Sequence, residues 1–252
     1  MRYFIKFSYL GTEFHGSQRQ PNGITVQETM EQALAMIFRE PIALTFAGRT
    51  DAGVHAREMY AHFDLANSQL PIAPNLVFRL NGILPNSIAI HDILPVTEDA
   101  HARFSATKRT YEYHIVDHKN PFLQTLATRV RPGLDLDAMN KAAKYLIGKQ
   151  DFASFCRSNT DVKTTICDLT QAEWKDLGGG HAVFTIAADR FLRNMVRAVV
   201  GTLFEVGRGK MTSEQFASVI QQHTRTAAGD SAPAEGLYLT HIDYPKELFL
   251  PL

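Results

Sequence analysis

The sequence is poor in cysteine and has neither a long apolar run nor an excess of charge of either sign. Its two cysteines, Cys156 and Cys167, form no C-x-x-C pair and have no histidine at zinc-finger spacing, which argues against a disulfide framework or a structural zinc site. No apolar run approaches the ~20 residues that span a bilayer. Charge interrupts residues 1–6 too early for a signal peptide. These absences predict a soluble, cytoplasmic protein with ordinary thiols, no metal site and no membrane partner.

The charges cancel, since 26 basic residues are matched by 26 acidic ones. Phosphate contacts usually require a positive surface, so this balance counts against a nucleic-acid partner, although a local basic patch can suffice. The 252 residues are 45% hydrophobic and 21% charged, which is typical of a globular protein with one large domain or two ordinary ones.

The first part of the chain predicts the order strand, helix, strand, strand, helix and strand. Thr25 and Glu28 have the spacing of a capping box, and they predict a helix that begins at Thr25. The other predicted elements are strands at 2–10, 42–47, 58–65 and 88–94, and a helix at 75–81.

The second part of the chain repeats this order with little residue identity. Asp137 is predicted to cap a helix that ends at Gly148. The other predicted elements are strands at 110–117, 165–175, 182–187 and 237–244, a helix at 191–206 stopped by Gly207, and a shorter helix that begins near Thr212 or Ser213.

Both parts therefore have the element order of the split βαβ unit. We predict an α+β fold of two tandem ferredoxin-like units, residues 1–105 and residues 106–252. With their sheets side by side, two such units would leave a central cleft between them.

One loop combines an acid, a cation and two glycines. The segment Gly48-Arg49-Thr50-Asp51-Ala52-Gly53-Val54-His55-Ala56 directly follows an apolar run at 41–47. Glycine permits the positive φ of a tight loop, and an acid on a loop at the end of a strand is well placed to meet a substrate. A plain turn is the alternative interpretation, because aspartate and glycine are common in turns for purely local reasons.

In this context the loop resembles the G-R-T-D-x-G-V-H-A signature of the tRNA pseudouridine synthase A family. Other segments resemble motifs of the same family, in the same order along the chain. They are Phe14–Gln20 with Thr25–Gln27, Arg103–Ala106 with Arg109–Tyr113, Met195–Arg197 with Gly201, and Ala232–Leu239. The resemblance spans most of the chain.

The resemblance implies an isomerase that converts uridine to pseudouridine in the tRNA anticodon stem-loop, at positions 38 to 40. The C1′–N1 bond breaks, uracil rotates in place, and C1′ rejoins at C5. This reaction needs no cofactor, which fits the lack of a Walker or Rossmann fingerprint. The implied partners are tRNA, bound in the central cleft, and a second copy of the chain as a homodimer. Candidate phosphate contacts are Arg19, Arg39, Arg57, Arg79, Lys108, Arg109, Arg190 and Arg193.

Asp51 is implied as the catalytic carboxylate, acting on a uridine that has left the base stack. Three routes stay open: attack on the sugar C1′, addition to the base, or removal of a sugar proton. Arg197 matches the arginine that pairs with this carboxylate in the family. A nearby guanidinium favours the charged form of a carboxylate and fixes its orientation.

Tyr111 matches the active-site tyrosine of the family, whose ring can stack on uracil. Proton transfer by its hydroxyl stays open, because an unperturbed phenol titrates near pH ~10. The alternative is that Tyr111 packs in the core and Tyr113 is the functional residue. Arg49 is expected to take the place of the flipped uridine or to grip its phosphate. Packing roles are expected for His55 and His62.

Two residues depart from the family pattern. Ser17 stands where many relatives carry a large aromatic residue, and Met59 stands where a glutamine is expected. Because of these two departures, the sequence does not establish which side chains contact the Asp51 loop.

Two other functions compete with the isomerase. One is a catalytically silent tRNA-binding protein on the same scaffold, against which the intact set of Asp51, Tyr111 and Arg197 argues. The other is an aspartate-dependent hydrolase that releases uracil from a free nucleoside.

Overall fold

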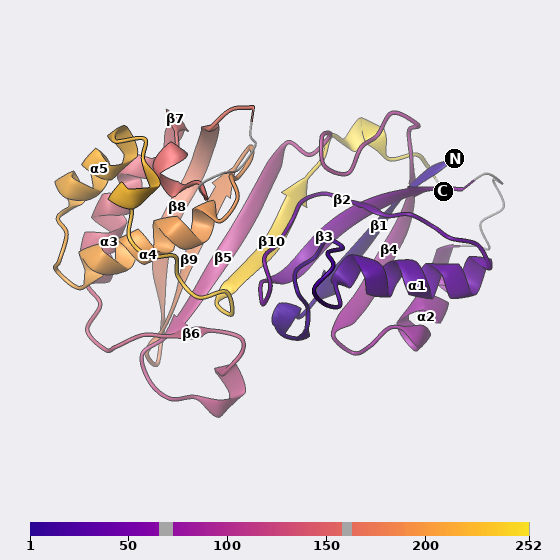
Figure 1. Ribbon diagram of the computed structural model, residues 1–252, viewed down its shortest axis with the longest axis horizontal. Coiled ribbons are helices and arrows are strands. Elements are labelled where there is room, and N and C mark those ends of the chain that lie inside the picture. The colour runs from indigo at the N-terminus through magenta and orange to yellow at the C-terminus, as the bar shows by residue number, and fades with distance from the viewer. Residues whose placement is uncertain (66–72, 158–162, 252) are drawn as a thin grey trace. The chain divides into compact units, whose positions relative to one another are not determined.

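The computed structural model describes residues 1–65, 73–157 and 163–251, and they form a mixed α+β fold (Figure 1). The chain groups into two compact units. The first unit comprises Met1–Thr107 together with Leu239–Leu252, and the second comprises Lys108–Tyr238. The division into two ferredoxin-like units at residue 105 stays a prediction.

The first unit is built on an antiparallel sheet. Strand β1 (Arg2–Tyr9) pairs on one side with β3 (His55–Asp64) and on the other with β4 (Ile88–Val96). The short β2 (Thr45–Phe46) also pairs with β3, and β10 (Leu237–Asp243) follows β3 in the strand order. The predicted strands at 2–10 and 88–94 are confirmed. Of the strand predicted at 42–47, the two residues Thr45 and Phe46 form a regular strand.

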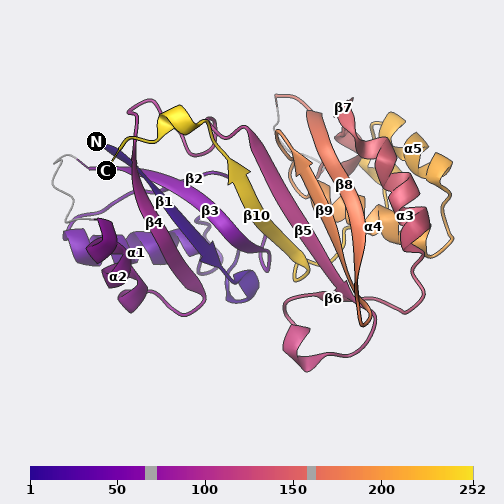
Figure 2. The same ribbon diagram turned by 180° about the vertical axis from the view of Figure 1, so that it is seen from behind.

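Two helices cover one face of this sheet. Helix α1 (Val26–Phe38) and helix α2 (Ala73–Ile83) lie in front of the strands in Figure 1 and behind them in Figure 2. The predicted start of the first helix is confirmed, because the Thr25 hydroxyl accepts the N–H of Glu28 at 3.3 Å. The apolar residues of α1 recur at helical spacing, so they share one face of the helix, and this face is buried in the core.

Glu58 is a buried acid that joins the C-terminal segment to the first unit. Its side chain is 10% exposed, and its carboxylate lies 2.7 Å from the Lys6 amine and 2.7 Å from Nδ1 of His241. It also accepts the N–H of Ile242 at 3.0 Å. A buried carboxylate needs such partners to offset its loss of water.

The second unit carries the strand order β5, β9, β8, β7. Neighbouring strands in this order are antiparallel, and they span Lys108–Val116 (β5), His181–Ala188 (β9), Ile166–Gly178 (β8) and Gly148–Asp151 (β7). The two-residue β6 (Thr128–Arg129) adds a parallel pair with β5. Strands β6 and β7 were not expected from the sequence.

The helices of the second unit are α3 (Leu136–Ala143), α4 (Met195–Gly207) and α5 (Ser213–Gln221). Helix α4 lies in front of β8 and β9 in Figure 1 and behind them in Figure 2. The expected cap at Asp137 is wrong, because the carboxylate of Asp135 accepts the N–H of Ala138 at 2.8 Å.

Helix α4 begins four residues after the predicted start at 191. Asn194 precedes it with a φ of 65°, a left-handed conformation that no helix continues through.

The cysteines, membrane-spanning helices and metal-ligand clusters can be examined in the described part of the chain. Cys156 and Cys167 are both buried and form no disulfide. Within the described ranges, no helix has the length and apolar character needed to cross a membrane. In the same ranges, no group of three or more His, Cys, Asp or Glu residues is placed to hold a metal ion.

Candidate functional site

Arg49 and Asp51 lie on the loop between β2 and β3 in the first unit. Arg49 is exposed and Asp51 is half-buried. The carbonyl of Asp51 accepts the N–H of Val54 at 3.2 Å, and Gly53 has a φ of 80°. Only glycine adopts this conformation without strain. The loop is therefore a tight turn that also presents a carboxylate, so the two interpretations of the motif are compatible.

Thr50, directly before Asp51, is held by side chains from two other segments. Its N–H donates to the hydroxyl of Ser17 at 2.8 Å, and its carbonyl accepts the N–H of Ser17 at 3.2 Å. Its own hydroxyl lies 2.8 Å from that of Tyr9 at the end of β1. Thr50 is therefore held by two hydrogen bonds to its backbone and one to its side chain, which fixes the chain on the N-terminal side of Asp51.

Close backbone contacts support the other side of the loop. The N–H of Gly11 donates to Nδ1 of His55 at 3.0 Å, and His55 is fully buried. A Cβ on Gly11 would lie 2.0 Å from the carbonyl oxygen of Val54. His55 therefore has the packing role that we expected for it.

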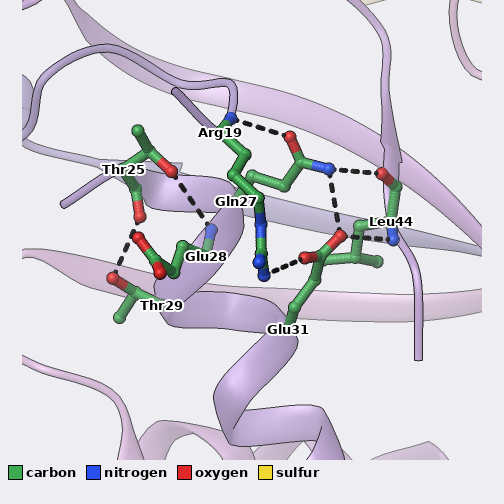
Figure 3. Close-up of polar contacts among 7 residues, drawn as sticks. All are labelled: Arg19, Thr25, Gln27, Glu28, Thr29, Glu31 and Leu44. Atoms are coloured by element: carbon green, nitrogen blue, oxygen red, sulfur yellow. Dashed lines mark hydrogen bonds and ion pairs between the residues drawn. The ribbon is translucent and has the colours of Figure 1, made fainter. Parts of the chain in front are cut away.

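A network around Glu31 ties the segment before α1 to the chain leading into the loop (Figure 3). The Glu31 carboxylate lies 2.7 Å from the Arg19 guanidinium and accepts the N–H of Leu44 at 3.0 Å. The amide of Gln27 donates to Glu31 and to the Leu44 carbonyl, each at 3.0 Å, and accepts the Arg19 N–H at 3.0 Å. The ion pair with Glu31 partly neutralises Arg19, one of the candidate phosphate contacts.

Tyr111 and Tyr113 lie on β5 in the second unit and differ in burial. Tyr111 is half-buried, with its ring edge-on to Phe191 at 5.0 Å between centroids. Tyr113 is fully buried; its hydroxyl lies 2.7 Å from that of Thr128 and donates to the Pro233 carbonyl at 2.8 Å. Burial raises the pKa of Tyr113 well above its ordinary value. Tyr113 is thus a core residue, and Tyr111 is the more accessible of the two.

Arg197 lies on α4 and holds the segment before β10. Its Nε donates to the Ala232 carbonyl at 2.7 Å, and its own carbonyl accepts the Ala232 N–H at 2.9 Å. A Cβ on Gly201 would lie 1.7 Å from the Asp230 carbonyl oxygen, so glycine is required for this close approach. Two of the segments singled out in the sequence, around Arg197 and around Ala232, therefore pack against each other.

His62 and Met59 also lie on β3, and both are buried. Met59 is fully buried and sits opposite Phe7, so it belongs to the core. His62 accepts the N–H of Ala102 through Nδ1 at 3.1 Å. Burial, with a smaller contribution from the positive charge of Arg2, lowers the pKa of His62 to about 4. His62 is therefore neutral near pH 7 and has a packing role, as we expected.

Ser17, Tyr9 and Gly11 are contacts of the loop that the sequence did not identify. Ser17 attracted notice as a departure from the family pattern, but its partner was not apparent from sequence. Of the four predicted site residues, Arg49 and Asp51 share one loop of the first unit. Tyr111 and Arg197 belong to the second unit, so their joining with Asp51 into one site is a proposal.

Comparison with known proteins agrees with the motifs. Residues 142–245 match a family model described as tRNA pseudouridine synthase, which is the class of protein that the chain resembles. Relatives named tRNA pseudouridine synthase A extend the likeness to nearly the whole chain. The relative from Porphyromonas gingivalis is 49% identical over 250 residues, 99% of each chain.

The other relatives give the same result. The one from Parabacteroides distasonis is 51% identical over 251 residues, 98% of each chain. The more distant one from Bacillus pumilus is 40% identical over 241 residues, 94% of this chain and 96% of its own. The chain belongs to the tRNA pseudouridine synthase A family.

Proposed function

We propose that this protein is a tRNA pseudouridine synthase that isomerises uridine in the anticodon stem-loop of tRNA, at positions 38 to 40. The observation that carries the proposal is the Asp51 loop, kept intact in a chain that matches its relatives over nearly their full length. Fixed backbone contacts on both sides of Asp51 support it, because a catalytic group is effective when it is held in place before the substrate arrives.

In the proposed mechanism, the uridine leaves the base stack and the Asp51 carboxylate acts on it. Arg49, exposed two residues away, takes the vacated position or grips the phosphate. Tyr111 stacks on the detached uracil while it rotates. Arg197 pairs with the carboxylate and keeps it ionised.

The finer points of architecture and partners belong to this proposal as well. Two ferredoxin-like units with an RNA-binding cleft, a homodimer and a cytoplasmic location all stay predictions. The antiparallel pairing of β1 with both β3 and β4 supports a ferredoxin-like arrangement in the first unit.

The experiment is to mix purified protein with an unmodified tRNA transcript and follow pseudouridine by mass spectrometry under single-turnover conditions. Asp51→Asn is expected to lower the rate by roughly a thousandfold or more, because it removes the reacting carboxylate. Asp64→Asn is the matched control: this exposed carboxylate pairs with Arg2 at 2.8 Å, and its loss should leave the rate within about twofold.

Four outcomes would contradict the proposal. Wild-type protein that forms no pseudouridine would remove it, and so would an Asp51→Asn variant that reacts at the wild-type rate. Release of free uracil would instead favour the hydrolase. If Asp51→Asn left both tRNA binding and cellular function intact, the silent tRNA-binding protein would be the better description.

A further inference from the structure

Ser17 is a fully buried polar residue whose hydrogen bonds go to the backbone next to Asp51. Its hydroxyl accepts the N–H of Thr50 at 2.8 Å, and its N–H donates to the carbonyl of Thr50 at 3.2 Å. These two groups belong to the peptide bonds before and after Thr50. The second of those peptide bonds leads directly into Asp51, so Ser17 restrains the backbone that carries the carboxylate.

The first turn of α1 anchors Ser17 in turn. The carbonyl of Ser17 accepts the N–H of Gln27 at 2.9 Å, and the carbonyl of Gly16 accepts the N–H of Val26 at 3.3 Å. The first N–H groups of a helix have no partner within the helix, so these bonds satisfy donors that would otherwise need water. The restraint on Asp51 therefore rests on a rigid helix.

The fit between the two loops leaves little room. Gly16 has a φ of 93°, and a Cβ there would lie 2.8 Å from the carbonyl oxygen of Thr50. On the far side of Asp51, its own carbonyl accepts the N–H of Val54 at 3.2 Å. Asp51 thus stands between two fixed points, and Ser17 supplies the side-chain contact at one of them.

From this geometry we propose that Ser17 is a positioning residue that holds the Asp51 carboxylate, through Thr50, in the place from which it acts. The proposal rests on the function proposed above. Without the Ser17 hydroxyl, the Thr50 N–H loses its acceptor and the loop gains other conformations. The carboxylate then spends less time in reacting position, which slows the chemical step. Because Ser17 is fully buried, its loss should leave tRNA affinity unchanged.

The test measures tRNA affinity and the single-turnover rate at saturating enzyme for wild type and Ser17→Ala. The expected result is a rate lower by roughly tenfold to a hundredfold, the scale of misplacing a reacting group, with the tRNA Kd within about twofold. Circular dichroism at the assay temperature confirms that the variant is folded.

Ser154→Ala is the matched control in the second unit. Ser154 is also fully buried, and its hydroxyl accepts the N–H of Thr224 at 3.2 Å and donates to the Val219 carbonyl at 2.6 Å. The substitution removes two side-chain hydrogen bonds of a buried serine, neither of which involves the Asp51 loop, whereas Ser17→Ala removes one. It should lower the melting temperature and leave the single-turnover rate within about twofold of wild type.

Ser17→Cys keeps the side-chain shape, with a somewhat larger atom in place of the hydroxyl oxygen, and retains a weak acceptor, so its rate should lie between those of wild type and Ser17→Ala. If Ser17→Ala does not fold, Ser17→Cys decides: a rate below that of wild type with an unchanged tRNA Kd supports the proposal, and a wild-type rate overturns it. The proposal also fails if Ser17→Ala reacts within twofold of wild type, slows only through weaker tRNA binding, or slows no more than Ser154→Ala. Those results leave the proposed function standing, whereas a wild-type protein without product overturns both.

Discussion

The protein is expected to lose stability as the pH falls from 6.5 to 4, and His62 is expected to cause a large part of that loss. Replacing His62 with asparagine should therefore make the stability fall less steeply over this range. His62 is 7% exposed on β3, and its Nδ1 accepts the N–H of Ala102 at 3.1 Å. Burial first, and then the charge of Arg2, lower its pKa from 6.5 to about 4. An imidazole in this position resists protonation for as long as the protein is folded.

The sign and size of the effect follow from proton binding. Between pH 6.5 and about 4 the unfolded chain binds a proton at His62 and the folded protein does not. The free energy of unfolding therefore falls as the pH falls through this range, and it is unaffected by His62 above it. At about 1.4 kcal/mol for each unit of pKa, the full loss from this residue is about 3 kcal/mol.

The assay is urea denaturation of wild type and His62→Asn at several pH values from 7.5 to 4, a range set by the two pKa values. The asparagine amide oxygen can still accept the Ala102 N–H, but it does not titrate. Circular dichroism is the appropriate signal, because the single tryptophan, Trp174, belongs to the second unit. His91→Asn removes an exposed histidine of the same sheet and serves as the control.

The comparison between variants is decisive, since the slope of wild type alone is not specific to His62. Burial and the charge of Arg2 also lower the pKa of His101, whose ring centroid lies 4.6 Å from that of His62. The stability of His62→Asn should fall less steeply than that of wild type, and His91→Asn should follow wild type. Parallel curves for wild type and His62→Asn would refute the reasoning.

Two further predictions concern the tyrosine pair and the packing of glycine. Tyr111→Ala should slow pseudouridine formation roughly tenfold to a hundredfold, the scale of one lost base stack. Tyr113→Phe should lower the free energy of unfolding by about 1–2 kcal/mol and leave the rate unchanged. The reverse pattern would make Tyr113 the functional residue. Gly11→Ala should cost about 3 kcal/mol in urea denaturation, because its Cβ would lie 2.0 Å from the Val54 carbonyl oxygen. Gly48→Ala has open space around its Cβ and should change stability by less than about 0.5 kcal/mol; equal losses at the two glycines would contradict the close approach.

Elements governed by local rules could be predicted from the sequence. Thr25 caps α1 as the spacing indicates, because its hydroxyl accepts the N–H of Glu28 three residues along the chain. The shorter helix expected near Thr212 or Ser213 is α5, and Thr212 is its N-cap. Strand β1 was predicted at 2–10 from its aromatic and β-branched residues, and it ends one residue earlier, at Tyr9. In each case the pattern and the structure depend on neighbours within one turn or one strand.

Elements that depend on distant partners could not be predicted. The apolar residues Phe191 and Leu192 continue the helical pattern of α4, yet the left-handed Asn194 ends that pattern ahead of Met195. The two-residue β6 exists through its pairing with β5. A run this short carries no periodicity from which a strand could be recognised.

The candidate site divides in the same way. The Asp51 loop is recognisable because its acid, cation and glycines are consecutive in the sequence. Its contact with Ser17 spans 33 positions, and no local pattern indicates it. The family resemblance did not help there either, since Ser17 is a residue at which this chain departs from the pattern.

The first unit contains both ends of the chain, and this affects the order in which the two units can fold during synthesis on the ribosome. Residues 239–252, which belong to that unit, are translated after the whole of the second unit. Until they emerge, the β3 edge lacks β10, and the buried Glu58 lacks both His241 and the Ile242 amide. The second unit, made of one continuous stretch, can therefore complete its folding while the first still waits for its closing strand.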